Sequence, residues 1–402
     1  MAQSSSLTAG RTAGDAQLQT RGLGWVLTAG MALPMLMLYA VGALGPLMTR
    51  DLGVTPGSLG WVTFSAFGVA ACLSPWAGPV TDRLGARRGL VLLFAAVAMA
   101  HASMYWAPSL GMLATSVAVI GVAQALCNPV TNLLIARQVA HAHKARMVGL
   151  KQSGVQVAAL IAGLALPSIA SHWGWRCALG AAAPLGLLLA VASCRVAGPK
   201  QPGPVRPMSP KKPNARLACL MAIQFGVGGA LAAFVALLPA HAVALGLEFA
   251  QAGGLIAVFA AAGIVSRIVL TPLAARLRDE SPLTGALLLI AAFAIGIVLT
   301  ATRESHWPLW MGALLMGASA AATNAVAMGM LVRDEGFGGL AVASGWLSAA
   351  FFAGLAIGSP LAGSVASAHG GFAPAWMGLA GVLGACAAIT LPLSRARRRA
   401  SA

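Results

Sequence analysis

The stretch GPVTDRLGARR, residues 78–88, places one carboxylate and three arginines between two long apolar runs. Apolar runs of roughly 20 residues recur from Trp25 to Pro392, and this is the length that a helix needs to cross a lipid bilayer. The 402 residues are 58% hydrophobic and only 9% charged, far from the composition of a soluble domain. We therefore interpret the short polar stretch as a loop between two membrane spans.

The apolar runs are continuous and do not alternate with polar residues, which favours helices over the strands of a membrane barrel. The sequence predicts an all-α polytopic membrane protein with twelve transmembrane helices. The spans are expected at residues 24–48, 58–81, 88–106, 109–136, 147–170, 175–195, 216–243, 249–275, 282–301, 307–332, 341–367 and 373–393.

A polar segment, residues 197–215, separates the sixth span from the seventh. It is rich in proline, glycine and lysine, a composition typical of a flexible linker. The linker divides the chain into two six-helix bundles, residues 24–196 and 216–393. Residues 1–23 lack the order of a signal peptide and are expected to form a short disordered cytoplasmic tail, and residues 394–402 a basic cytoplasmic tail.

The net charge of +17 follows the positive-inside rule. The predicted outer segments hold Arg50, Arg176 and Arg303, and Arg267 falls within a span, so the other 22 of the 26 lysines and arginines lie in segments predicted to be cytoplasmic. This distribution predicts a multi-pass protein of the cell inner membrane with both termini in the cytoplasm. The basic residues near the C-terminus are then expected to anchor on anionic lipid headgroups, and no nucleic-acid partner is expected.

Neither metal-binding nor enzymatic chemistry is indicated by the remaining motifs. The six cysteines have no CxxC spacing, the histidines do not cluster, and signatures such as GxSxG, HExxH and GxxxxGK[ST] are absent from the sequence. We therefore expect no catalytic residues, no metal and no cofactor.

The loop between the second and third spans resembles the signature of the major facilitator superfamily, in which a glycine precedes Asp-Arg, a second glycine and basic residues. The matching residues are Gly78, Asp82, Arg83, Gly85, Arg87 and Arg88. The resemblance implies two pseudo-symmetric six-helix bundles that rock about a central cavity. The protein is expected to be a monomer. The resemblance also implies that the loop braces a closed inner gate near Ala341, with Arg137 as the charge partner of Asp82. A loop that serves topology alone is the alternative.

A weak internal repeat supports two related halves. A shift of 193 residues lays the stretch that begins at Gly60 over the one that begins at Gly253, so that Arg83 meets Arg276 and Asp82 meets Ala275. The second copy has therefore lost the carboxylate of the first.

The nine acidic residues all fall in tails, loops or span edges, so a cationic substrate is disfavoured. Arg267 is the exception among the basic residues, because it lies within a span, where a charge costs about 2.5–3.5 kcal/mol near the helix centre. It either reaches inward to loop carbonyls or binds a substrate anion, for which a guanidinium is well suited. Either a coupling proton travels on the substrate or on a histidine, or the protein is a uniporter or an exchanger.

The segment from Tyr39 to Arg88 is similar to the first two helices of bacterial monocarboxylate and oxalate/formate-type carriers. In those carriers an arginine of helix eight contacts the substrate carboxylate, and the resemblance implies this role for Arg267. Residues 341–367 hold no Arg or Lys in place of the second cation of oxalate-type carriers, which favours a single anionic head.

Polar residues of the first half are candidates for the other wall of the cavity. Gln124, Asn128 and Asn132 share one face of span four, Gln152 and Gln156 mark span five, and Tyr39 lies in span one. Hydrogen bonding between helices is the alternative role for each.

The predicted function is secondary transport of a small organic anion, with a monocarboxylate as the expected substrate. Three alternatives stay open: an exporter of hydrophobic compounds that does not need Arg267, a nitrate- or cyanate-type carrier suggested by KQSG and GWR, and a membrane sensor or scaffold without flux.

Overall fold

The computed structural model describes residues 2–54, 59–196, 212–368 and 370–401. These residues form helices and no strands. The first half contains α1 (Ala2–Leu52), α2 (Leu59–Tyr105), α3 (Leu110–Gln138), α4 (His141–Leu164), α5 (Leu166–Gly180) and α6 (Ala182–Val196). The second half contains α7 (Ala215–Ala244), α8 (Phe249–Ala274), α9 (Ser281–Leu299), α10 (Trp307–Ala318), α11 (Ala320–Arg333), the short 3-10 turn η2 (Glu335–Phe337), α12 (Leu340–Ala368) and α13 (Ala373–Ser401).

Within the described residues, 11 helical segments are long and apolar enough to cross a membrane. The segment Leu59–Tyr105 holds two crossings, because Gly85 leaves the helical conformation with φ 79° and ψ 161°, a region that favours glycine. Gly174, with φ 80°, makes a similar break between the fifth and sixth crossings. The described chain thus makes twelve crossings, which agrees with the all-α polytopic fold predicted from the sequence.

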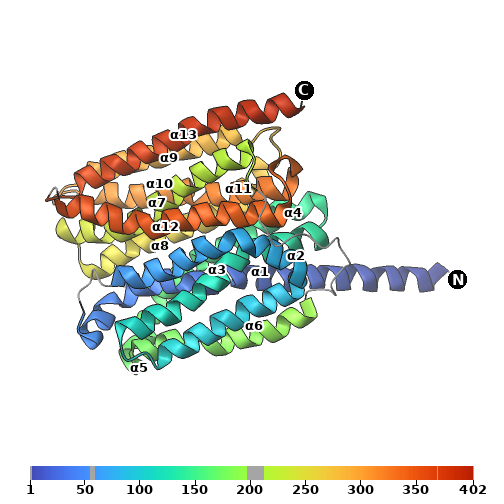
Figure 1. Ribbon diagram of the computed structural model, residues 1–402, viewed down its shortest axis with the longest axis horizontal. Coiled ribbons are helices and arrows are strands. Elements are labelled where there is room, and N and C mark those ends of the chain that lie inside the picture. The colour runs from blue at the N-terminus through green and yellow to red at the C-terminus, as the bar shows by residue number, and fades with distance from the viewer. Residues whose placement is uncertain (1, 55–58, 197–211, 369, 402) are drawn as a thin grey trace.

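The two halves lie side by side, with their helices roughly along the long axis of the molecule (Figure 1). The half coloured blue to green fills the lower part of the view, and the half coloured yellow-green to red fills the upper part. Both ends of the chain lie at the right in this view, as an even number of crossings requires. We call this end of the bundle, which also holds the Gly85 turn, the termini side.

Several helix boundaries differ from the sequence prediction. α1 extends back to Ala2, so the segment expected to be a disordered tail is helical, and α13 continues to Ser401 through the predicted basic tail. α4 begins at His141, before the predicted start of span five. Of the predicted linker, residues 197–211 lie outside the described residues, and Asn214 caps α7 by accepting a hydrogen bond from the Leu217 amide at 2.9 Å.

The tenth crossing is broken in its middle. Ser319 has φ −113° and ψ −77°, which ends α10 and starts α11, and the backbone on either side of the break becomes available to neighbouring helices. Ser266 of α8 donates to the Gly317 carbonyl at 3.1 Å. The break therefore positions α8 against this crossing.

Candidate functional site

The halves meet closely between α2 and α12 on the termini side. A methyl group at Gly78 would lie 2.6 Å from the carbonyl carbon of Ala341 and 2.7 Å from the Cα of Val342. Gly345 packs in the same way on the backbone of Ser74, one turn further along both helices. The absence of side chains at Gly78 and Gly345 is therefore what lets α2 and α12 touch.

A second close contact joins α4 of the first half to α8 of the second. Gly149 lies against the backbone of Arg267, and a methyl group at Gly263 would lie 2.8 Å from Cγ of Gln156. Gln156, predicted to line a cavity, is thus packed on α8 in this conformation.

Two hydrogen bonds connect α3 to α12. Asn128 donates from Nδ2 to Ser348 Oγ at 3.0 Å, and Asn132 donates from Nδ2 to Ser344 Oγ at 2.9 Å. Asn128 lies ten residues before the end of α3, a depth of roughly 15 Å at 1.5 Å per residue. Together with the two helix contacts, this pair of bonds holds the halves together on the termini side.

The loop at residues 78–88 lies at this closed end. Gly78 contacts the start of α12 at Ala341, the place that the family resemblance implied for the loop. Asp82 is partly buried, whereas Arg83, Arg87 and Arg88 are exposed around the Gly85 turn. Arg137 is exposed in the last turn of α3, and its pairing with Asp82 stays a prediction.

Arg267 is only 2% exposed. Its Nε donates to the carbonyl of Ala321, just after the break in the tenth crossing, at 2.7 Å, and its Nη1 donates to the carbonyl of Gln152 in α4. Tyr39, buried in α1, is close enough to Arg267 for an electrostatic interaction. Arg267 therefore bridges the two halves through backbone oxygens of helices and not of loops, and its role in binding an anion stays a prediction.

Lys151 is a second buried cation, which the charge distribution had assigned to the cytoplasmic side. It is 0% exposed, and its Nζ donates to Thr131 Oγ1 at 2.7 Å and to Asn128 Oδ1 at 3.2 Å. Gln152 donates from Nε2 to the same Asn128 oxygen at 3.0 Å. Of the predicted residues, the structure thus brings Asn128, Gln152 and Arg267 together and adds Lys151 to them.

Several amide atoms around this cluster are buried and have no hydrogen-bond partner among the described residues. They are Gln124 Nε2, Asn132 Oδ1, Gln152 Oε1 and Gln156 Oε1. Buried polar atoms of this kind normally find a partner, so each of them has capacity to bind a ligand or water. Asn128, in contrast, uses both amide atoms within the protein.

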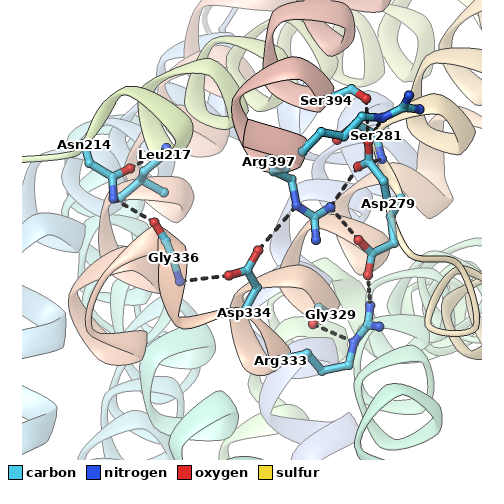
Figure 2. A network of polar contacts seen from close by, with 12 residues as sticks. Asn214, Leu217, Asp279, Ser281, Gly329, Arg333, Asp334, Gly336, Ser394 and Arg397 are labelled. Atoms are coloured by element: carbon cyan, nitrogen blue, oxygen red, sulfur yellow. Dashed lines mark hydrogen bonds and ion pairs between the residues drawn. The ribbon is translucent and has the colours of Figure 1, made fainter. Parts of the chain in front are cut away.

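A network of ion pairs closes the termini side of the second half (Figure 2). Glu280, 4% exposed, forms an ion pair with Arg333 at 2.6 Å and accepts a hydrogen bond from Arg397 at 2.5 Å. Arg397 also pairs with Asp279 at 3.1 Å and with Asp334 at 3.3 Å. Because Arg397 points into this network, it is not available as the lipid anchor that the sequence suggested for this basic segment.

Asp279 has a perturbed acidity within the network. Burial alone would raise its pKa, but hydrogen bonds from Ser394 and Ser281 and the charge of Arg397 outweigh burial and hold the pKa below its usual value. The ionised carboxylate is therefore the form that stabilises this end of the fold.

On the opposite side of the bundle, Arg176 has a structural partner. It donates to Asp51 at the end of α1, and Trp175 donates from Nε1 to the same carboxylate at 3.0 Å. These hydrogen bonds lower the pKa of Asp51. The GWR segment thus links α1 to α5. Arg176 therefore has a structural role that needs no bound substrate.

A family profile of the Major Facilitator Superfamily matches residues 26–336 of this sequence. The chain belongs to the major facilitator superfamily. It is therefore a multi-pass membrane protein of a family whose members carry small-molecule solutes by secondary transport.

Solved structures of superfamily transporters share the fold. The transporter FucP in its outward conformation aligns with a TM-score of 0.68 at 16% identity, over 93% of this chain and 98% of FucP. A second structure of FucP, described as the E. coli fucose:proton symporter, aligns equally well. The human organic anion transporter MFSD10 (TETRAN) aligns with a TM-score of 0.72 at 15% identity, over 92% of this chain and 99% of MFSD10. No curated protein matches the sequence.

Proposed function

We propose that this superfamily member carries a small organic anion across the cell inner membrane, with its termini in the cytoplasm and as a monomer. A monocarboxylate is the simplest substrate that Arg267 can bind. The two halves rock about the contacts of α2 with α12 and of α4 with α8, and the state described here is closed on the termini side.

The burial of Arg267 without an acidic partner among the described residues carries this proposal. A guanidinium has five N–H donors, and the described residues supply two acceptors, both neutral carbonyl oxygens. A buried charge is expected to be paired, and a carboxylate of the solute would supply the missing charge. The nine acidic residues of the sequence offer no carboxylate within a span for a cationic solute.

Binding of an anion to Arg267 would also bear on the gate. The Gln152 carbonyl that Arg267 binds belongs to the other half, so a solute carboxylate competes for a guanidinium that links the halves. Substrate binding and gate opening are then coupled through a single side chain.

Counterflow into proteoliposomes tests the proposal. Protein reconstituted with unlabelled solute inside would be offered labelled butyrate, nitrate and a hydrophobic cation, and wild type would be compared with Arg267→Gln. Arg278→Gln, at an exposed arginine just beyond α8, is the matched control.

We expect saturable butyrate uptake that Arg267→Gln reduces by about tenfold or more, as for the loss of a charged hydrogen bond, and that Arg278→Gln leaves unchanged. Uptake confined to the hydrophobic cation, or anion uptake that does not depend on Arg267, contradicts the proposal. Uptake of nitrate alone would identify an inorganic anion carrier instead.

A further inference from the structure

Lys151 lies beside Arg267 in a cluster that holds two positive charges. Arg267 donates to the backbone carbonyl of Gln152, while the side-chain amide of Gln152 and Nζ of Lys151 donate to the same oxygen of Asn128. Gln152 therefore connects the two cations: its backbone oxygen binds Arg267, and its side-chain amide shares an acceptor with Lys151.

Neither cation has an acidic partner in the part of the chain that the structure describes. Lys151 donates to an amide oxygen and to a hydroxyl, which leaves its third N–H without an acceptor there. The Lys151 ammonium is 0% exposed and bonds to neutral oxygens alone, so its buried charge has no counter-ion among the described residues.

The internal repeat shows that the fold does not require these charges. The shift of 193 residues that lays Arg83 over Arg276 also lays Ser74 over Arg267 and Gly345 over Gln152. The structure agrees with this pairing, because Gly345 packs on Ser74 where α12 meets α2, just as Gln152 meets Arg267 where α4 meets α8.

The same shift lays Lys151 over Ser344. One of the two related contacts between halves is thus neutral, with serines at both positions, and the other carries both cations. A packing role would be filled equally well by a small neutral residue, as it is at Ser344, so the lysine has a different role.

We infer that Lys151 is a second anion-binding group and that the transported solute carries two negatively charged groups, as a short dicarboxylate does. One carboxylate binds Arg267, and the other receives the remaining donor of Lys151. The buried amide oxygens of Gln152 and Gln156 that lack partners lie on the same helix and can accept hydrogen bonds from water or from a donor group of the solute. This inference rests on the proposed function and changes the class of the expected substrate.

The second charge comes from α4, so the absence of Arg and Lys from residues 341–367 does not limit the solute to one carboxylate. The pair spans both halves, since Lys151 belongs to the first half and Arg267 to the second. A dicarboxylate is then the class of solute that can contact both halves with a full charge at each end.

Counterflow of two solutes of equal length tests the inference. Labelled succinate and butyrate have four carbons each and differ by one carboxylate. The ratio of their uptake rates therefore reports how much the second charge contributes to transport. Wild type would be compared with Lys151→Gln and Lys151→Arg. Lys144→Gln, the same change on the same helix outside the buried cluster, is the control. Size-exclusion elution of each purified variant reports folding.

We expect wild type to take up succinate faster than butyrate, and Lys151→Gln to reduce succinate uptake by about tenfold or more while butyrate uptake stays within about twofold. Lys151→Arg should keep part of the succinate uptake. Arg267→Gln should abolish uptake of both solutes.

Two results would overturn the inference while the anion carrier stands: butyrate uptake without succinate uptake in wild type, or equal losses of both solutes in a folded Lys151→Gln protein. If wild type takes up neither anion, both the inference and the proposed function are wrong.

Discussion

Replacement of Gly78 by alanine tests whether the contact of α2 with α12 is a gate. The new methyl group would lie 2.6 Å from the Ala341 carbonyl carbon, where 3.4–4 Å is an ordinary contact. The neighbouring atoms are backbone and cannot rotate away, so the helices must separate by roughly 1 Å, which forfeits much of their dispersion attraction.

The cost falls on one conformation only. Overpacking of this kind destabilises by about 1–3 kcal/mol, and the penalty disappears when the halves separate on the termini side. The equilibrium between closed and open states should therefore shift toward the open state by about 5- to 150-fold.

Pulsed electron paramagnetic resonance can measure this shift. Spin labels at His141→Cys and Arg276→Cys, both exposed at the termini side and in different halves, would report the separation of the halves in a protein whose six native cysteines are replaced. Gly60→Ala is the matched control, because a methyl group there has nothing within 4 Å.

A second, longer distance should appear or grow in Gly78→Ala and not in Gly60→Ala. If the two variants give the same distance distribution as the parent, the contact of Gly78 with α12 does not depend on the state of the transporter, and its interpretation as a gate is wrong.

Two further predictions concern the ion-pair network of Figure 2. Arg397→Gln should lower the free energy of unfolding by about 1–3 kcal/mol, because it leaves buried Glu280 with one partner fewer. Arg398→Gln, at a side chain that is 73% exposed, should change the free energy of unfolding by less than about 0.5 kcal/mol. Thermal unfolding in detergent measures both variants, and equal effects would contradict the prediction. The pKa of Asp279 is lowered in the folded protein, so its contribution to stability is present above the usual aspartate pKa of about 3.9 and is lost as pH falls through the lowered value. Melting temperatures measured between neutral and acidic pH should therefore fall less steeply in Asp279→Asn than in wild type. Identical slopes in the two proteins would exclude this carboxylate as the cause.

The positions of the membrane crossings could be predicted because composition determines them. Long apolar runs have no stable alternative to helices in lipid, and Gly85 and Gly174 mark turns between crossings by the conformations that glycine permits. The break at Ser319 could not be predicted, since it depends on α8, whose Ser266 binds the carbonyl beside it.

The candidate site was only partly predictable. Arg267 was identified because a charge in an apolar run is conspicuous, but its partners are backbone carbonyls, which no sequence pattern specifies. Lys151 was counted among the cytoplasmic basic residues, because it lies near the predicted start of span five at residue 147. In the structure α4 already begins at His141, which carries Lys151 ten residues into the helix and into the buried cluster.

The pairing of Glu280 with Arg397 has a consequence for biosynthesis. The two residues are 117 positions apart, and at about 5–20 residues per second a ribosome needs roughly 6–23 s to add that stretch after Glu280 has been made. During that interval the loop between α8 and α9 carries two carboxylates that lack Arg397. The second half of this transporter therefore completes its termini side only after α13 has been made, and a chain interrupted before Arg397 leaves Asp279 without the ion pair that Arg397 forms.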